Sequence, residues 1–281
     1  MGNQIHWFPG HMKKALDEIK EKIKIVDVVI ELFDARCPFS SINNELEQII
    51  SNKKKLVILT KPDLADPVRT DKLKAELCKK YDAILVLNIN DQKSQKAIID
   101  AVSKLGGEKH KRDISRGMKP QPIRAMILGI PNVGKSSLIN RFASKKVAGV
   151  QNKPGYTRGE QWIKVSNDFL LLDTPGVLPM NYDDKKKALN LALVGSIREE
   201  ILPTNELSDS LLKYLKNNYP NSLKERFDID SIDDFQQTYL SISKKRGLLD
   251  GKGNPDLARA QILLLKEFKD GKLGRISLEN I

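Results

Sequence analysis

Two short motifs stand in an unusual order along this chain of 281 residues. The tetrapeptide Thr60-Lys61-Pro62-Asp63 follows an apolar run, and about seventy positions later residues 129–136, GIPNVGKS, form a glycine-rich loop of the kind that wraps phosphate groups. In ordinary nucleotide-binding domains with both motifs, the phosphate loop comes first and the Lys-Pro-Asp motif near the end. The inverted order predicts a circularly permuted domain, whose new junction has to be tied down by other parts of the chain.

Alternating apolar runs and amphipathic segments predict the fold class. Compact apolar runs precede the motifs and indicate buried strands, and apolar stripes at helical spacing lie between them. We expect strands at 26–33, 56–59, 83–87 and 123–128, a hairpin of 161–165 with 169–172, and helices at 11–24, 45–51, 69–81, 94–105 and 135–143. This alternation predicts an α/β domain with a mostly parallel sheet and flanking helices.

Composition divides the chain into two expected domains. Residues 1–181, with the N-terminal helix included, hold both motifs and all the strand signals, so they form the permuted domain. Within it, residues 106–122 read GGEKHKRDISRGMKPQP and are expected to be a mobile linker. From 182 to 281 the apolar clusters have helical spacing only, which predicts an all-helical C-terminal domain.

Positive charge is concentrated in the first part of the chain. Residues 1–180 hold 31 Lys and Arg against 20 Asp and Glu, a net of +11, whereas residues 181–281 hold 17 against 16, a net of +1. A basic surface suggests a polyanionic partner, most simply nucleic acid, although a solubilising surface explains the charge equally well. Cys37 and Cys78 have no metal-binding or redox spacing. With no signal peptide and no membrane-length apolar run, we expect a cytoplasmic chain that makes no membrane contact.

The glycine-rich loop predicts a phosphate site with Mg²⁺. Its backbone N–H groups can wrap a β-phosphate, while Lys135 reaches the β- and γ-phosphate oxygens and the Ser136 hydroxyl binds the metal. Asp173 is expected to hold Mg²⁺ through a bound water, and the Gly176 N–H to bond the γ-phosphate. The loop residues expected to contact the nucleotide are Asn132, Val133, Gly134, Lys135, Ser136 and Ser137.

The motif that begins at Thr60 predicts recognition of guanine. The Asp63 carboxylate can accept hydrogen bonds from guanine N1–H and N2–H₂, a pair that adenine lacks. Lys61 would lie along the base or brace the phosphate loop. Thr60 stands where Asn is more usual, and its hydroxyl can still bond a neighbouring loop. After the third expected strand, the backbone N–H groups of Asn88 and Ile89 can meet guanine O6. Alone, Lys-Pro-Asp is equally well a turn; beside a phosphate loop it indicates GTP.

Two further positions bear on hydrolysis. Thr157 follows Pro-Gly and is a candidate Mg²⁺ ligand that orders when a γ-phosphate is present, although Pro-Gly is also an ordinary turn. Val177 stands where a glutamine usually orients the attacking water. Valine cannot orient water, so another group has to place it. This predicts slow intrinsic hydrolysis and assistance from a partner.

Taken together, these motifs resemble a known family. The order of guanine motif, phosphate loop and Asp173-Thr174-Pro175-Gly176, with Val177 in place of glutamine, is similar to that of the circularly permuted GTPases of the YlqF/YawG group. The opening Trp7-Phe8-Pro9-Gly10-His11-Met12 and the GIPNVGKS loop strengthen the likeness. The resemblance covers essentially the whole chain.

The resemblance implies a GTPase that acts late in assembly of the large ribosomal subunit and is activated by the particle that it binds. It implies that His11 substitutes for the missing glutamine and that K⁺, with Asn132 as a ligand, stimulates the reaction. It also implies that the helical domain, with residues 244–247 and 271–275, binds rRNA. From the residues alone, His11 is a helix-start histidine, Asn132 an ordinary loop residue and the C-terminal segments solvated loops.

Two classes of function therefore remain. The first is a GTP-hydrolysing assembly factor that acts on rRNA and large-subunit precursors. The alternative is a nucleotide-gated RNA-binding or scaffold module in which hydrolysis is incidental. A membrane-associated GTPase is a third, weaker possibility, because the sequence carries no membrane anchor.

Overall fold

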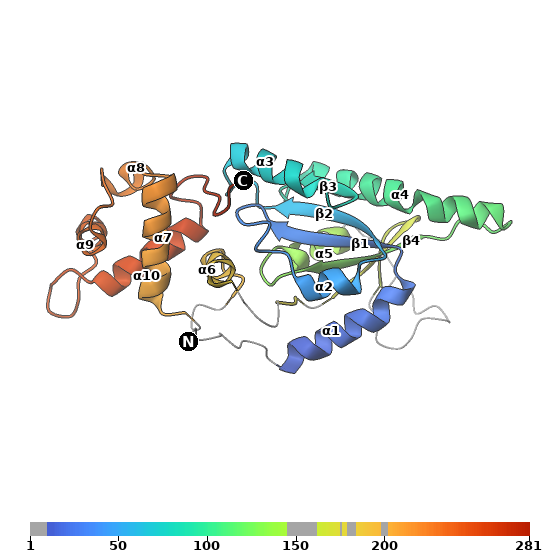
Figure 1. Ribbon diagram of the computed structural model, residues 1–281, viewed down its shortest axis with the longest axis horizontal. Coiled ribbons are helices and arrows are strands. Elements are labelled where there is room, and N and C mark those ends of the chain that lie inside the picture. Colours follow the sequence, from blue (N-terminus) through green and yellow to red (C-terminus); the bar gives the residue numbers. More distant parts are fainter. Residues whose placement is uncertain (1–9, 145–161, 175, 179–183, 198–201) are drawn as a thin grey trace.

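The computed structural model describes residues 10–144, 162–174, 176–178, 184–197 and 202–281; for residues 10–12 and 144 it describes the backbone. Six strands form one sheet in the order β3-β2-β1-β4-β6-β5 (Figure 1). Neighbouring strands are parallel except for β5, which runs antiparallel to β6. The strands are β1 (Val28–Asp34), β2 (Lys54–Thr60), β3 (Ala83–Val86), β4 (Ile123–Gly129), β5 (Trp162–Ser166) and β6 (Phe169–Leu172). The expected α/β fold with a mostly parallel sheet is confirmed.

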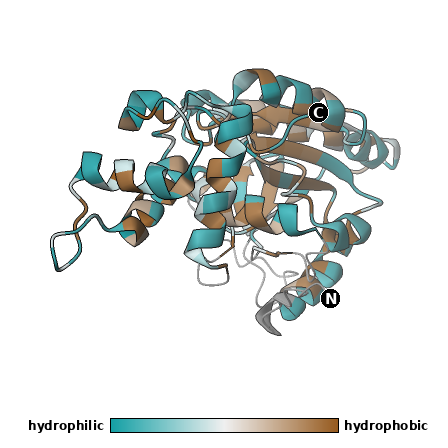
Figure 2. Ribbon diagram, turned by 60° about the vertical axis from the view of Figure 1, so that its left-hand side comes forward, coloured by the Kyte–Doolittle hydropathy of each residue, from teal (hydrophilic) through white to brown (hydrophobic). Residues whose placement is uncertain are grey.

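Strand β1 lies in the middle of the sheet, and both of its faces are covered. All seven of its residues are buried, as expected for a continuous apolar run in a parallel sheet. Val28, Ile30 and Leu32 face the helices α4 (Gln92–Ser115) and α5 (Lys135–Ser144). Alternate residues face the helices on the other side, α1 (Gly10–Lys22), α2 (Asn44–Ile49) and α3 (Pro67–Leu77). Figure 2 shows the apolar strands enclosed between helices with polar outer faces.

Helix α1 enters the fold from the side where the parallel strands end. A short 3-10 turn, Ile23–Ile25, separates it from β1, so the helix and the strand run in opposite directions (Figure 1). Ala15, Leu16 and Ile19 bury the apolar stripe of the helix against the sheet. The backbone of His11 therefore lies in the first helical turn, at the carboxyl-terminal side of the sheet.

Helix α4 corrects the expected linker at 106–122, because it continues without a break to Ser115. Gly106 explains the difference: a Cβ at this position would lie 2.4 Å from Ile123 Cδ1, so glycine allows the helix to pass close to β4. Lys109 Nζ then donates to Asp27 Oδ2 at 3.0 Å and to the Pro122 carbonyl at 2.9 Å. Gly106 and Lys109, which suggested a linker, are a packing contact and a pairing contact of one long helix.

The C-terminal part is helical, as expected. After β6 come α6 (Lys185–Leu193), α7 (Thr204–Asn218), α8 (Lys224–Phe227), α9 (Phe235–Arg246) and α10 (Leu257–Lys269). Leu211 of α7, Ile242 of α9 and Leu264 of α10 are fully buried in one cluster that continues into the core on the α4 side of the sheet. No helix within the described ranges is long and apolar enough to cross a membrane.

After α10, the chain returns to the sheet and docks beside its carboxyl edge. The Ile276 N–H donates to the Leu64 carbonyl at 3.0 Å, and the Leu278 N–H to the Arg36 carbonyl at 2.7 Å. The Glu279 carboxylate accepts from the backbone N–H groups of Phe39 and Ser40, both at 2.8 Å. This C-terminal tail, residues 273–279, thereby joins the helical part to the loops that follow β1 and β2 (Figure 1).

Candidate nucleotide-binding site

Those expected site residues that the structure describes gather at the carboxyl edge of the parallel strands. Strands β1, β2, β3, β4 and β6 all point to this edge, and the permuted motifs follow β2 and β4. Ligands of open α/β sheets bind at such an edge, where the connections diverge to the two faces. The permuted order in the sequence therefore does not prevent the two motifs from meeting in space.

The backbone of the phosphate loop adopts conformations that glycine permits. Gly129 has φ 152°, and a Cβ there would lie 2.8 Å from the Leu32 carbonyl oxygen. Gly134 has φ 112°, and a Cβ there would lie 2.7 Å from Ile89 Cδ1. Helix α5 begins directly after it, at Lys135. The loop thus opens onto a helix N-terminus, where backbone N–H groups and the helix dipole favour an anion.

Lys135 lies beneath this loop rather than in solvent. Its Nζ donates to the Gly129 carbonyl at 3.0 Å and to the Ile130 carbonyl at 3.1 Å. Burial lowers the pKa of Lys135 to about 8, and the Asp173 carboxylate opposes that shift. A Cβ at Gly176 would lie 2.8 Å from the same Nζ. The ammonium group and Gly176 are therefore adjacent, which the expected contact of both with one γ-phosphate requires.

Oxygen donors suitable for Mg²⁺ lie beside this lysine. Ser136 is in the first turn of α5 and Asp173 follows β6, and both side chains are exposed. Next to Asp173, the buried Thr174 hydroxyl donates to the Ile127 carbonyl of β4, which fixes the end of β6 to β4. A hydroxyl and a carboxylate fit Mg²⁺, which retains several waters and takes few protein ligands. Thr157, the third expected contributor, lies outside the described residues.

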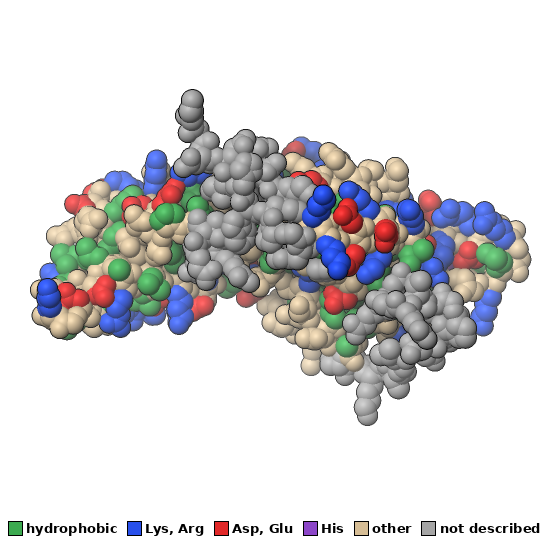
Figure 3. Space-filling view, turned by 90° about the horizontal axis from the view of Figure 1, so that it is seen from below, with side chains coloured by type: hydrophobic (Ala, Val, Ile, Leu, Met, Phe, Trp, Pro, Cys, Tyr) green, Lys and Arg blue, Asp and Glu red, His purple; other side chains and the backbone are tan. Residues whose placement is uncertain are grey.

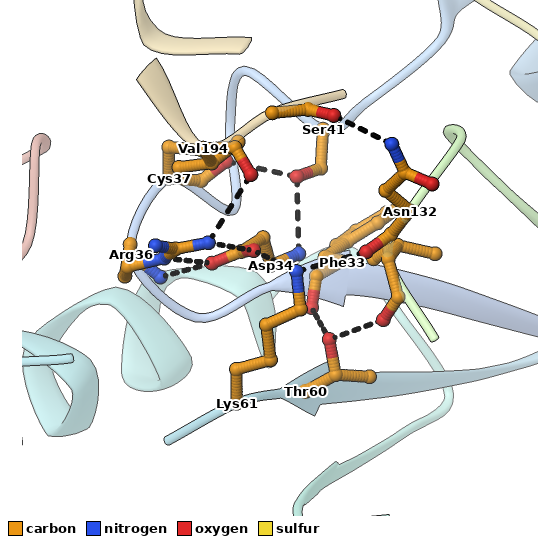
Figure 4. Close-up of polar contacts among 11 residues, drawn as sticks. Phe33, Asp34, Arg36, Cys37, Ser41, Thr60, Lys61, Asn132 and Val194 are labelled. Carbon is orange, nitrogen blue, oxygen red and sulfur yellow. Dashed lines mark hydrogen bonds and ion pairs between the residues drawn. The ribbon is translucent and has the colours of Figure 1, made fainter. Parts of the chain in front are cut away.

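Thr60 and Lys61 connect the base motif to the phosphate loop (Figure 4). The buried Thr60 hydroxyl lies 2.8 Å from the Val133 carbonyl oxygen and 3.2 Å from that of Phe33, so it can donate its proton to the phosphate loop. Lys61 has φ 54°, and its Nζ donates to the Asn132 carbonyl at 2.8 Å. Of the two positions open to Lys61, the structure shows the one that braces the phosphate loop.

A buried ion pair that the sequence analysis missed supports Lys61. Asp34, at the end of β1, is 0% exposed; its carboxylate accepts from Arg36 Nε at 2.9 Å and Nη2 at 2.8 Å, and from Lys61 Nζ at 3.1 Å. Burial alone would raise the pKa of Asp34, but Arg36 and Lys61 outweigh it and hold the pKa at about 2. The only sequence signal was an Asp-x-Arg after a buried strand.

Asp63 and the segment after β3 lie together, as the expected reading of a guanine base requires. Asn88 Nδ2 donates to Asp63 Oδ1 at 3.1 Å, and the Asn88 side-chain oxygen accepts from the Asn90 N–H at 3.0 Å. Asp63 is exposed, whereas Ile89 is buried against Gly134 of the phosphate loop. The carboxylate and the N–H groups proposed for guanine O6 are therefore neighbours, next to the phosphate loop.

The remaining expected residues are placed as follows. Asn132 is exposed with φ 58°, and its Nδ2 donates to the Gly195 carbonyl after α6 at 2.7 Å, a contact that the sequence did not suggest. Ser137 is exposed on α5. Val177 is buried in the cluster that α1 forms on the sheet, so it packs rather than facing solvent. The side chain of His11 lies outside the described residues.

Comparisons with known proteins match this chain to GTPases. A profile of the 50S ribosome-binding GTPase family matches residues 124–240. This span begins in β4, so Asp63 precedes it in the chain and lies outside the match. Ribosome biogenesis GTPase A of Bacillus cereus is 41% identical over 98% of this chain and 93% of its own length. The protein of that name from Thermotoga maritima is 32% identical over 97% of this chain and 93% of its own.

A solved structure has the same fold. The crystal structure of GNP-bound YlqF from T. maritima superposes with a TM-score of 0.69 at 28% identity, covering 95% of this chain and 100% of the other. The likeness extends over the sheet and the helical part together. The chain therefore belongs to the ribosome biogenesis GTPase A family of circularly permuted GTPases.

Proposed function

We propose that this chain hydrolyses GTP on precursors of the large ribosomal subunit, in the cytoplasm, and contacts rRNA there. The observation that carries the proposal is that Lys61 bonds two loops at once. Its Nζ donates to the Asn132 carbonyl of the phosphate loop and to the Asp34 carboxylate at the end of β1. Arg36 in the loop after β1 binds the C-terminal tail. A series of hydrogen bonds thus links the loops at the nucleotide site to the C-terminal tail of the helical domain. A GTPase that responds to a bound particle requires such a link between its two sites.

In this proposal, residues at the carboxyl edge share the work on GTP. Asp63 accepts from the guanine N–H groups, while Asn88 and Ile89 offer N–H groups to guanine O6. The N–H groups of residues 132–137 and the Lys135 ammonium hold the phosphates. Ser136, Thr157 and, through water, Asp173 hold Mg²⁺, which neutralises charge on the β- and γ-phosphates. Gly176 lies beside Lys135 and senses the γ-phosphate.

The attacking water needs a group other than residue 177, and we assign that role to His11. Val177 is buried against the sheet, and Leu16 of α1 belongs to the same cluster. Because α1 begins at the carboxyl side of the sheet, its first turn is on the nucleotide side of the fold. An imidazole with a pKa near neutrality can orient water and accept its proton. Docking on the particle would aim this side chain.

We further assign a K⁺ site to the Asn132 side chain. Its Nδ2 is directed to the Gly195 carbonyl at 2.7 Å, so the amide presents Oδ1 as the atom for a cation. A monovalent ion beside the phosphates would stabilise negative charge that develops during hydrolysis. GTP turnover in K⁺ should exceed that in Na⁺ at equal ionic strength, and Asn132→Asp or Asn132→Ala should change this preference without changing guanine selectivity.

A turnover assay tests the function directly. GTP hydrolysis is measured with the full chain alone, with purified large-subunit precursors, and with small subunits as a control particle. Stimulation by the large-subunit precursors is expected. His11→Ala should keep particle and GTP binding and lose stimulated hydrolysis by about 10²-fold or more. Lys14→Ala, at an exposed position of the same helix, is the matched control.

Two results would count against parts of the proposal. Nucleotide-dependent particle binding without any stimulation of turnover would favour a scaffold in which hydrolysis is incidental. Normal stimulated hydrolysis by His11→Ala would return His11 to a structural role at the helix start and leave the water to rRNA, K⁺ or another side chain.

A further inference from the structure

The far end of α4 carries a dense group of unpaired positive charges. We call residues 111–121 the α4 tip. Lys111, Arg112, Arg116 and Lys119 are all exposed, and none of them makes an ion pair with any residue that the structure describes. The one acid in the segment, Asp113, is buried and accepts from the Gln121 N–H at 3.1 Å. The tip therefore presents to solvent four cations that form no ion pair with a carboxylate of the described residues.

The tip is a built structure rather than a loose linker. Gly117 has φ 69° and ends the helix, with the Met118 N–H donating to the Asp113 carbonyl at 2.9 Å and the Gly117 N–H to the Ile114 carbonyl at 2.9 Å. The chain then folds back, and His110 Nε2 lies 3.0 Å from the Gln121 carbonyl oxygen. Because the backbone is fixed in this way, the four charges keep a defined spacing.

The helical domain distributes its charge differently. Lys216 pairs with Asp233 at 2.9 Å, Lys224 with Asp230 at 2.9 Å and Lys245 with Asp228 at 3.3 Å. Glu267 lies between Arg226 and Arg246 and pairs with both. Many of its cations are therefore neutralised locally. In Figure 3 Lys and Arg side chains also gather at the right-hand end, the end where α4 projects past the sheet in Figure 1.

We propose that the α4 tip binds the phosphate backbone of structured RNA. Exposed, unpaired Lys and Arg at fixed spacing are the groups that displace counterions from a polyanion. Two exposed apolar side chains, Ile114 at 62% and Met118 at 46%, lie among them and can pack on riboses or unstacked bases. The inference rests on the proposed function and adds to it a second RNA surface, outside the helical domain.

A membrane surface fits the tip less well than RNA. A helix that lies in a bilayer needs a continuous free apolar face. The apolar stripe of α4, which includes Ile98 and Val102, is already buried on the sheet. Only Ile114 and Met118 remain free on this segment among the large apolar side chains that the structure describes as exposed.

The position of the tip predicts how it works. Helix α4 has 24 residues, so it spans about 36 Å at about 1.5 Å per residue. It starts after β3, at the nucleotide edge, and ends before β4, at the opposite edge of the sheet. A contact at this distance from the γ-phosphate should hold RNA equally well with GTP and with GDP. The tip would be an anchor that does not depend on the nucleotide.

Neutralising the tip in the full chain tests the inference. The test variant is Lys111→Gln/Arg112→Gln/Arg116→Gln/Lys119→Gln. The matched control removes the same charge from four exposed lysines that lie outside both the tip and the helical domain, Lys72→Gln/Lys93→Gln/Lys96→Gln/Lys164→Gln. Binding to a large-subunit rRNA transcript is measured over a salt series with a non-hydrolysable GTP analogue and with GDP. Basal GTP turnover and thermal unfolding of both variants should match the unchanged protein, which excludes misfolding.

We expect the tip variant to bind RNA at least about tenfold more weakly at low salt, with the slope of log K against log salt reduced by about 3, and by equal amounts in both nucleotide states. The control variant should keep most of the RNA affinity and most of its salt dependence. A tip variant with unchanged affinity and slope, or a control that loses more, overturns the inference while leaving the proposed function intact. Tip-dependent binding to vesicles of phosphatidylglycerol and phosphatidylcholine, but not to RNA, also overturns it. Tip-dependent RNA binding without stimulation of turnover by large-subunit particles would instead contradict the proposed function alone.

Discussion

The hydroxyl of Thr60 lies 2.8 Å from the carbonyl oxygen of Val133, a contact between two motifs that are 73 positions apart in the chain. Lys61 adds a second contact, to the next carbonyl of the same loop at Asn132. These bonds engage carbonyl groups of the phosphate loop and not its N–H groups. They give the loop that holds Asp63 a fixed position relative to the phosphate loop.

Thr60→Val should weaken nucleotide binding through the phosphate loop, because the Thr60 hydroxyl bonds the Val133 carbonyl of that loop. Valine has nearly the same shape but leaves the buried Val133 carbonyl without its donor, which costs about 1 kcal/mol. We expect GTP and GDP affinities to fall together by about fivefold, as measured by fluorescence titration. Thr70→Val removes a similar buried hydroxyl bond, to the Asp66 carbonyl at 2.7 Å, without touching the loop. Equal losses in both variants would mean that the effect is general destabilisation.

Asp34→Asn should destabilise the protein strongly. The change leaves the Arg36 guanidinium, 2% exposed, without its counter-charge. Breaking a buried pair in this way costs about 3 kcal/mol or more in the free energy of unfolding, as measured by urea titration. Asp82→Asn removes the partner of Lys54 in a half-exposed pair and should cost about 1 kcal/mol or less. A loss from Asp34→Asn no larger than the control would show that the pair has no special role.

Glu31 gives the stability a pH dependence that Glu31→Gln should remove. Burial and the neighbouring Glu47 carboxylate raise the pKa of Glu31 from 4.5 to about 8. Between these values the folded state keeps a proton that the unfolded state releases, so this stabilising contribution is complete below about pH 4.5 and is lost as the pH rises towards about 8. Glu31→Gln should therefore gain stability over the unchanged protein at about pH 8, by on the order of a few kcal/mol. Glu21→Gln, exposed on α1, controls for loss of a carboxylate. Parallel pH profiles of unfolding for Glu31→Gln and the unchanged protein would contradict this.

Arg275→Ala should weaken nucleotide binding from the C-terminal tail. The Arg275 guanidinium donates to the carbonyls of Pro62 and Ala65, both at 2.8 Å, on either side of Asp63. Because Arg275 is exposed, we expect a loss of about 1 kcal/mol, or about fivefold, in GTP and GDP affinity. Arg259→Ala removes a comparable bond to the Leu249 carbonyl within the helical domain and should leave affinity unchanged. Unchanged affinity in Arg275→Ala would mean that the tail does not support the base loop.

Local signals in the sequence were enough to predict the sheet and the phosphate loop. Apolar runs define β1, β2 and β4, and the glycine pattern defines the turn into α5, because these depend on neighbouring residues. The extent of α4 could not be predicted in this way. In the sequence, Gly106 looks like a residue that ends a helix. Only the structure shows that Ile123, which is 17 positions further on, packs against it.

The hydrogen bonds that hold the loops of the site could not be predicted for the same reason, because they join residues far apart in the chain. Arg36 and Val194 are 158 positions apart, and Ser40 and Glu279 are 239 apart, yet each pair is hydrogen-bonded. No periodicity or motif encodes contacts of this range, so the role of Asp34 and the docking of the C-terminal tail appear only in the structure. The functional assignments of individual site residues stay predictions that rest on where the fold places them.

The nucleotide preference of Asp63→Asn tests the central claim most directly, namely that a base reader placed before the phosphate loop serves the same site. Turnover of GTP and of xanthosine triphosphate is measured with large-subunit particles, with Asp71→Asn on α3 as a control. We predict that Asp63→Asn binds GTP more weakly, by about 1.5–3 kcal/mol for each charge-assisted bond removed, and so turns it over less efficiently. The same variant should turn over xanthosine triphosphate better, because the C2 oxygen of that base suits an amide donor. An Asp63→Asn variant that still prefers GTP would show that the guanine base is read elsewhere.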